Sequence, residues 1–154
     1  MPTTTDAWLV DTNVVLRWAL IQHPQYPIAA RAVEALVLRG VEIYVTPQSL
    51  VEAWNVCTRP LESNGFGLTP QTTRLELGRV KSFFRLAADS PDVFPVWERL
   101  VADHDVSGVK VHDARLAAFM EVYEIPNILT FNTRDFARYA GIAAVNPRDI
   151  ASVI

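Results

Sequence analysis

Cysteine is almost absent from this chain of 154 residues, since Cys57 is the only one. A single cysteine excludes an internal disulfide, and we expect a reducing, cytoplasmic location. The chain also has no uninterrupted run of about 18 apolar residues, which a membrane-spanning helix needs. Its first residues, MPTTTDAWLVD, lack the basic start and the sustained apolar stretch of a secretory signal. These absences predict a protein without a membrane partner.

Positive charge is also scarce, because the net charge is −3 and the pI is near 5.6. This balance argues against a protein that coats nucleic acid by bulk electrostatics. It leaves a nuclease open, because metal ions bound by carboxylates become the largest local positive charges. The acidic balance therefore predicts that any binding of nucleic acid depends on metal.

Several catalytic signatures are missing as well. His23, His104 and His112 show no zinc-ligand spacing with the lone cysteine. No glycine-rich loop of the nucleotide-binding kind occurs, which disfavours an ATPase. No serine lies in a nucleophile-elbow sequence, which disfavours a serine hydrolase.

What the chain does have is an ordinary globular composition, with 50% hydrophobic and 20% charged residues. Its length suits one domain with one core, and no repeat or long linker interrupts it. We therefore expect a single domain over residues 1–154.

Short apolar runs predict strands over 7–10, 41–45, 127–131 and 142–145, with a further short strand over 93–96 that Pro95 interrupts. Helical patterns are typical of residues 14–21, 28–39, 71–87, 97–103, 112–123 and 132–139, and a helix should begin at Pro47 after a Thr46 cap. Pro24 and Pro27 should break the first helical stretch, Gly40 should end the next, and Thr58 to Pro70 should form a loop. Alternating strands and helices predict an α/β fold in which helices cover both faces of a mostly parallel sheet of about four or five strands, giving three layers α/β/α.

Four acidic residues follow or lie within apolar segments: Asp11 in LVDTN, Glu52 in TPQSLVEAW, Asp113 in VHDARLAAF and Asp135 in LTFNTRDF. An unpaired buried carboxylate is costly, so each needs a partner. Asp11 and Asp135 follow predicted strands at their carboxyl ends, where ligands gather in parallel sheets. Glu52 and Asp113 lie near helix starts at the same edge. Converging carboxylates favour a hard divalent cation.

These motifs, in this order and spacing along nearly the whole chain, resemble the PIN-domain nucleases, and most of all the short VapC-like ribonuclease toxins of toxin–antitoxin pairs. The resemblance implies that Asp11, Glu52, Asp113 and Asp135 hold one or two Mg²⁺ or Mn²⁺ ions and cleave RNA. It also implies a homodimer and a small antitoxin partner. The positions that match the family's supporting polar residues are Thr12, Asn13, Thr130 and Asn132. Products with 5′-phosphate and 3′-hydroxyl ends are expected from the same resemblance.

The chemistry suits phosphodiester hydrolysis independently, because paired metal ions about 4 Å apart activate water and neutralise the leaving oxygen. Each residue also has a simpler interpretation. Asp11 or Asp135 can cap a helix, Asp113 can interact with a helix dipole, and Glu52 can be solvated. Arg134 suits a phosphate or antitoxin contact as well as a plain surface charge.

Other residues favour structural roles. His112 lies beside Asp113, but neighbours on a helix do not face each other. The tryptophans, Phe83 and Phe84 are expected mainly in the core or a dimer contact rather than as stacking platforms for bases.

Two other functions stay open. One is a PIN-like module that binds RNA or protein without turnover. The other is a phosphatase of the haloacid-dehalogenase type, although Asn13 stands where that chemistry usually has a second aspartate. Hydrolysis of p-nitrophenyl phosphate would favour the phosphatase.

Overall fold

Five short strands form one sheet in which every neighbouring pair is parallel, in the order β3-β2-β1-β4-β5. The computed structural model describes residues 6–151. Residues 1–5, part of the segment in which we expected no secretory signal, lie outside it, as do residues 152–154. The elements are β1 (Ala7–Val10), α1 (Thr12–Ala19), α2 (Tyr26–Leu38), β2 (Glu42–Val45), α3 (Pro47–Thr58), the 3-10 helix η2 (Leu61–Ser63), α4 (Pro70–Phe83), β3 (Arg85–Leu86), α5 (Val93–Asp103), α6 (Lys110–Tyr123), β4 (Asn127–Leu129), the 3-10 helix η3 (Thr133–Phe136), β5 (Ala143–Val145) and α7 (Pro147–Ala151).

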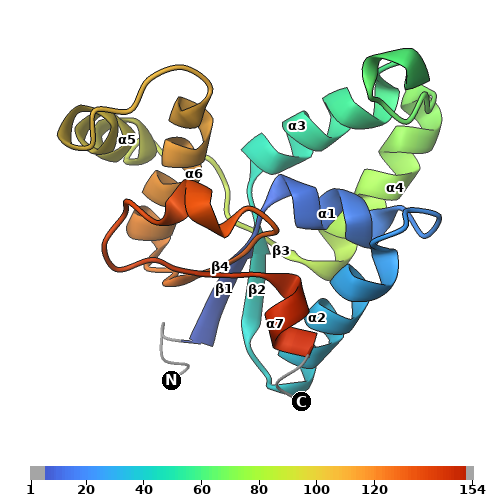
Figure 1. Cartoon of the computed structure of the whole chain (residues 1–154), viewed down its shortest axis with the longest axis horizontal. Coiled ribbons are helices and arrows are strands. Elements are labelled where there is room, and N and C mark those ends of the chain that lie inside the picture. The colour runs from blue at the N-terminus through green and yellow to red at the C-terminus, as the bar shows by residue number, and fades with distance from the viewer. Residues whose placement is uncertain (1–5, 152–154) are drawn as a thin grey trace.

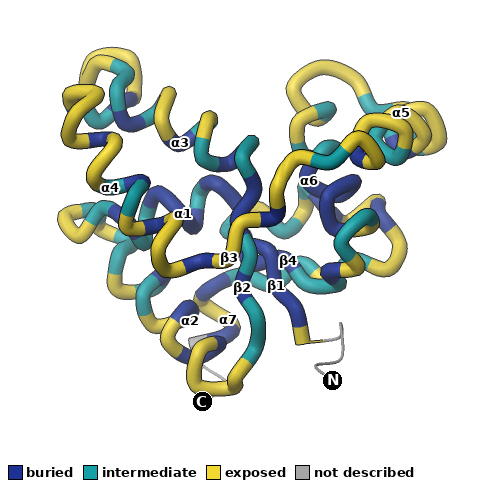
Figure 2. Tube along the Cα trace, turned by 180° about the vertical axis from the view of Figure 1, so that it is seen from behind, coloured by how far each residue is buried: buried dark blue, intermediate teal, exposed yellow. Residues whose placement is uncertain are grey.

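Helices cover both faces of this sheet (Figure 1), which confirms the predicted three-layer α/β fold. Alternate residues of β1 point to opposite faces, as the strand period of two requires. Trp8 and Val10 join one core with α1, α2, α3 and α4. Ala7 and Leu9 join the other with α5 and α6. β1 is dark along its length in Figure 2 because both of its faces are buried.

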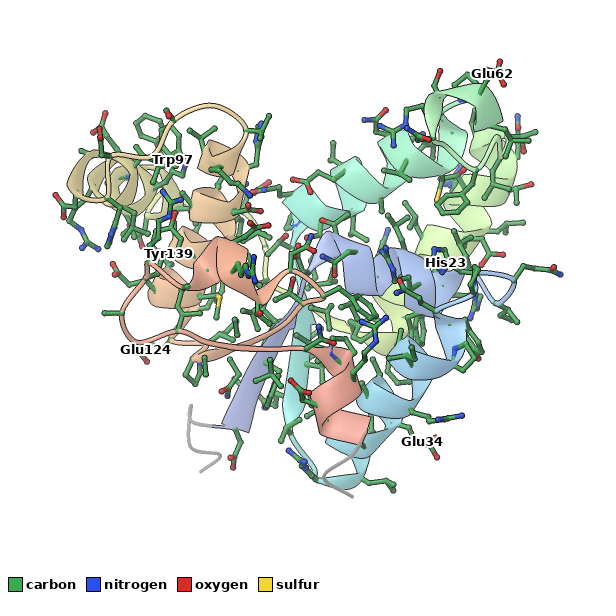
Figure 3. All side chains as sticks on the ribbon, viewed as in Figure 1. His23, Glu34, Glu62, Trp97, Glu124 and Tyr139 are labelled. Atoms are coloured by element: carbon green, nitrogen blue, oxygen red, sulfur yellow. The ribbon has the colours of Figure 1, made fainter. Side chains whose placement is uncertain are left out.

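Two groups of helices extend beyond the sheet, α3 with α4 on one side and α5 with α6 on the other (Figure 1). Trp97, labelled in Figure 3, joins the second group by donating a hydrogen bond from Nε1 to the Val111 carbonyl oxygen at 2.8 Å. Trp18 packs in the first group, with ring centroids 4.9 Å from both Phe83 and Phe84. Together with the burial of Trp8 and Phe84, these contacts confirm a structural role for most of the aromatic residues, whereas Trp54 and Phe83 are exposed.

Of two predictions based on prolines, one is wrong and the other is confirmed. The segment 93–96 is the start of α5, not a strand, and Pro95 lies in its first turn. The break expected at Pro24 and Pro27 is confirmed, since residues 20–25 separate α1 from α2, although α2 begins at Tyr26, two residues before its predicted start, with Pro27 in its first turn. The first backbone N–H groups of a helix have no partner within the helix, so proline costs little there.

Other boundaries differ at the ends of elements. The helix predicted to reach Ala87 ends at Phe83 and gives way to β3, which was not predicted. The helix predicted over 132–139 is only the short η3, and α7 was missed. The Thr46 cap and Pro47 start of α3 are confirmed, since Thr46 Oγ1 accepts from Ser49 N at 3.1 Å. Within residues 6–151, no helix is long and apolar enough to cross a membrane.

Candidate metal centre

Asp11 follows β1, the strand at which the order of strands across the sheet changes direction. On one side of β1 lies β2, the next strand in the sequence, and on the other side lies β4, which comes much later. Asp11 N donates to the Leu129 carbonyl oxygen at 3.0 Å, which carries the pairing with β4 to the end of the strand. Ligands of open α/β sheets bind outside the carboxyl ends of strands at such a reversal.

The Asp11 carboxylate accepts hydrogen bonds from both sides of this junction. Oδ1 accepts from Thr12 N at 2.7 Å, which caps α1. Oδ2 accepts from Thr130 Oγ1, just after β4, at 2.8 Å and from Asn13 Nδ2 at 3.4 Å. The capping role considered from the sequence is therefore real. It occupies one oxygen, while the other faces the neighbouring strand end.

Thr130 connects the polar residues predicted to support the site. Its Oγ1 donates to Asp11 and accepts from Asn13 Nδ2 at 3.4 Å and from Asn132 N at 3.0 Å. Asn13 Oδ1 in turn accepts from Phe131 N at 3.2 Å. The structure thus brings Thr12, Asn13 and Thr130 together by their side chains, whereas Asn132 joins through its backbone N–H.

Glu52 reaches this network from α3 on the opposite side. Its Oε2 accepts from Thr12 Oγ1 at 2.8 Å, and its Oε1 accepts from Gln48 Nε2 at 2.9 Å. Gln48 Nε2 also donates to the His112 carbonyl oxygen at 2.9 Å, and Gln48 Oε1 accepts from Arg115 Nη1 at 3.1 Å. Gln48 therefore joins α3 to α6 and brings Glu52 toward the helix that carries Asp113.

Asp113 and Asp135 are held differently. Asp135, in η3, forms an ion pair with Lys110 at the start of α6. Asp113 is half-buried in the first turn of α6 and makes no hydrogen bond through its side chain to any other part of the chain that the structure describes. It interacts electrostatically with Asp11, Asp135, Lys110 and Glu52.

Burial and mutual repulsion raise the pKa values of two acids. Loss of solvent raises the pKa of Asp11 to about 6, despite the lowering effect of the hydrogen bonds from Thr130 and Thr12. Burial, followed by repulsion from Asp11 and Asp135, raises the pKa of Asp113 to about 6 as well. Carboxylates whose charges oppose each other in a partly buried place are stabilised by a cation.

The donor set fits a hard divalent cation, because it consists of carboxylate and hydroxyl oxygens with no imidazole or thiolate. Among residues 6–151, however, no three His, Cys, Asp or Glu side chains are grouped closely enough to hold a metal ion as they stand. Three of the acids have other partners: Asp11 is held by Thr130, Glu52 by Thr12 and Gln48, and Asp135 by Lys110.

Comparison with known families supports the same architecture. A model of the PIN domain family matches residues 8–142. The chain belongs to the PIN domain family. No curated protein sequence matches it significantly.

Solved structures of similar fold accompany this family match. A chain of the DNA-bound VapBC complex from Salmonella typhimurium has a TM-score of 0.68 at 14% identity, covering 92% of this chain and 98% of the other. One of the DNA-bound VapBC2 complex from Rickettsia felis has a TM-score of 0.66 at 14% identity, with 91% and 98% covered. VapC20 of Mycobacterium tuberculosis, a toxin that cleaves the sarcin–ricin loop, has a TM-score of 0.59 at 16% identity, with 88% and 98% covered. At such identities the likeness establishes a PIN fold.

Some neighbours of this PIN centre escaped the sequence prediction. Gln48 is one helical turn before Glu52, and Lys110 is one turn before Asp113. Helical spacing from each predicted acid would have found both. Arg134, which the sequence singled out, is exposed on η3, and its side chain pairs with no acid among residues 6–151.

Proposed function

We propose that this PIN protein is a divalent-metal-dependent endoribonuclease that hydrolyses RNA phosphodiester bonds with a metal-activated water. The observation that supports this most is that four acids from separate elements interact electrostatically near the reversal of the sheet order. Asp11 and Asp113 carry raised pKa values there, for which a bound cation would compensate. PIN domains are nucleases as a family, and VapC20, one of the proteins of similar fold, cuts RNA in the sarcin–ricin loop.

Asp11, Asp113, Glu52 and Asp135 would hold the ions, one or two of Mg²⁺ or Mn²⁺. Bound there, such ions supply an activated water and offset charge on the phosphate and the leaving oxygen. The chain's own contribution is orientation. The Asp11 carboxylate accepts hydrogen bonds from the Thr130 hydroxyl at 2.8 Å and from the Thr12 backbone N–H at 2.7 Å. The Thr12 hydroxyl donates to the Glu52 carboxylate at 2.8 Å.

Near the start of α6, the ion pair between Asp135 and Lys110 must break before the paired Asp135 oxygen is available to a metal. Lys110 is exposed and can then turn toward solvent or a phosphate. Asp113 needs no such exchange, since its side chain has no hydrogen bond within residues 6–151. These two acids therefore supply the adjustable ligands of the centre.

We further propose that the protein is the toxin of a toxin–antitoxin pair, acting as a cytoplasmic homodimer. Several proteins of similar fold come from such pairs, including the VapBC complexes of Salmonella typhimurium and Rickettsia felis. A small antitoxin that covers the acidic centre is the partner expected on this proposal. Co-expression with the neighbouring gene, followed by size-exclusion chromatography of the purified product, tests it.

Metal binding is the first experiment, because a toxin that cuts only one RNA can fail on an arbitrary substrate. Mn²⁺ is titrated by calorimetry into the wild-type protein and into Asp113→Asn, with a short non-cleavable oligonucleotide present. Asp92→Asn is the matched control, since Asp92 is exposed and its side chain makes no capping bond. We expect binding in the wild type and in Asp92→Asn, and loss in Asp113→Asn.

RNA cleavage is measured with the same three proteins, each shown free of contaminating ribonuclease. Products with 5′-phosphate and 3′-hydroxyl ends support attack by water. Cyclic-phosphate ends, or full activity in Asp113→Asn, would overturn the mechanism. Absence of Mn²⁺ binding in the wild type would favour the non-catalytic binding module, and p-nitrophenyl phosphate hydrolysis would favour the phosphatase.

A further inference from the structure

Two arginines flank one aromatic ring beside the acidic centre. The guanidinium carbon of Arg17, in α1, lies 5.0 Å from the centroid of the Phe131 ring. That of Arg148, in α7, lies 5.4 Å from the same centroid. The two side chains come from opposite ends of the sequence and meet on a residue just after β4. We name this group the arginine–phenylalanine stack.

Neither arginine of the stack pairs with an acid among residues 6–151. Arg17 donates to neutral acceptors only, through Nη1 to the Asn13 carbonyl oxygen at 2.9 Å and through Nε to Gln25. The Arg148 side chain makes no hydrogen bond or ion pair within the same residues. Other arginines do have acidic partners in the structure: Arg79, Arg85, Arg99 and Arg115.

The pairing of two cations without an acid has a cost. Burial lowers the pKa of Arg17, and repulsion from Arg148 lowers it further. A guanidinium has five N–H donors, and Arg17 uses two of them on Asn13 and Gln25. The stack thus has free donors, excess positive charge and a ring within cation–π distance of both guanidinium groups.

The stack shares residues with the acidic centre. Asn13, whose carbonyl oxygen holds Arg17, places its side chain on Asp11 and Thr130. Phe131 is the residue after Thr130, and its backbone N donates to Asn13 Oδ1 at 3.2 Å. Electrostatic attraction also acts between Arg17 and Asp11. A strand of nucleic acid with one phosphate at the acidic centre would have its neighbouring phosphates near the stack.

From this we infer that Arg17, Phe131 and Arg148 form a phosphate-binding subsite that holds the RNA strand beside the bond to be cut. The inference rests on the proposed function. A guanidinium matches phosphate with paired N–H donors, and two of them around one ring give a fixed anion site. The subsite touches the strand through its backbone, so it positions RNA without selecting a base.

Arg148→Gln tests the subsite most cleanly, because Arg148 makes no hydrogen bond through its side chain within residues 6–151. Binding of a fluorescein-labelled single-stranded RNA is measured by anisotropy over a range of salt, with Ca²⁺ replacing Mg²⁺ and RNA integrity checked on gels. Arg39→Gln is the matched control. Arg39 is also exposed, but it follows α2 and precedes β2, so it lies at the amino end of the strands, away from the carboxyl end where the acidic centre lies.

We expect Arg148→Gln to weaken RNA binding severalfold and to reduce the slope of log affinity against log salt by about 0.7, the value for one phosphate contact to a single strand. Arg148→Lys should recover part of the loss, because it keeps the charge but not the paired donors. Arg148→Gln should weaken the binding of a DNA strand of the same sequence by the same factor. Mn²⁺ binding should be unchanged in Arg148→Gln.

Equal affinity and salt slope in Arg148→Gln and Arg39→Gln would overturn the subsite and leave the nuclease proposal intact. Loss of Mn²⁺ binding in Arg148→Gln would overturn it too, because the residue would then act on the structure of the acidic centre. A wild-type protein that binds Mn²⁺ but not this RNA would overturn the subsite alone, because a ribonuclease selective for one RNA need not bind an arbitrary strand. Arg17→Gln is the second variant, and it should show the same reduction in slope.

Discussion

Asp11 and Glu52 are held by hydrogen bonds from neutral groups, whereas Asp113 and Asp135 are not. The first pair, which we term the α1 side, accepts from Thr130, Thr12 and Gln48. The second pair, the α6 side, has one ion pair with the exposed Lys110. Neutral donors fix a carboxylate without cancelling its charge. On the proposed function, the α1 side is preorganised for a cation, and the α6 side would rearrange to complete the site.

The difference predicts unequal effects of the same substitution on the two sides. Asp11→Asn should lower Mn²⁺ affinity and RNA cleavage by more than the roughly 10- to 100-fold typical of residues that only orient metal ligands. Asp135→Asn should cost about tenfold, because breaking the Lys110 ion pair offsets part of what the wild-type carboxylate contributes. Calorimetry and cleavage rates on both variants measure the ratio. Equal losses would mean that the two sides do not differ in preorganisation.

Thr130 should be the most important of the residues that do not carry charge. Thr130→Val keeps the shape but removes the hydroxyl that contacts Asp11, Asn13 and Asn132. We expect Mn²⁺ affinity to fall about 10- to 100-fold, and the free energy of unfolding to fall by about 1–3 kcal/mol, because buried polar partners lose their bonds.

A matched control for this variant exists in α4. Thr73 is also fully buried, but its Oγ1 has no hydrogen-bond partner. Thr73→Val should leave Mn²⁺ affinity unchanged and should keep or raise thermal stability. Should the two valine variants behave alike, the Thr130 network would have no special role in the centre.

The sequence predicted the architecture and the position of Asp11 well because their signals are local. Thr46 before Pro47 and Asp11 after a buried strand are patterns whose meaning depends on a few neighbouring residues. The strand periodicity and the alternation of elements then place Asp11 at the carboxyl edge. Pro95 was harder, because a proline fits the first turn of a helix as well as it interrupts a strand, and the local sequence did not decide between the two.

The α6 side could not be predicted in the same detail. The contact between Lys110 and Asp135 joins residues 25 positions apart, and the Gln48 bridge to α6 spans 64. Such pairs depend on how helices pack across the sheet, which a single sequence does not specify. The stack of Arg17 and Arg148 on Phe131 is still more remote, since α7 itself was missed.

Asp113 should make the free energy of unfolding of the metal-free protein depend on pH. Its folded pKa of about 6 exceeds the ordinary value of 3.8, so the folded protein binds more protons than the unfolded chain between these values. Metal-free stability therefore falls as pH rises from about 4 through about 6. Asp113→Asn removes this loss. Because the side chain is half-exposed to solvent, which screens the effect, we expect a gain of about 1 kcal/mol at pH 7, or about 3 °C in Tm, and none below pH 4.

Thermal unfolding in EDTA, with and without Mn²⁺, checks this prediction. Added Mn²⁺ should stabilise the wild type and leave Asp113→Asn unaffected, so that the order of the two Tm values reverses. Asp92→Asn should follow the wild type throughout. A variant no more stable than the wild type at pH 7 without metal would show that Asp113 is not destabilised by its neighbours.

Substitution of Lys110 should have the smallest effect on Mn²⁺ affinity, but it tests the rearrangement of the α6 side most directly. Lys110→Met removes the cation that holds Asp135, so Mn²⁺ has no competitor for that carboxylate. Because the ion pair is exposed and screened by salt, Mn²⁺ affinity should rise only a few-fold, and most clearly at low ionic strength. Arg99→Met is the control, because Arg99 forms a similarly exposed ion pair with Glu121 on α6. Weaker Mn²⁺ binding in Lys110→Met alone would instead mean that Lys110 orients Asp135 for the metal, and the α6 side would then be preorganised like the α1 side.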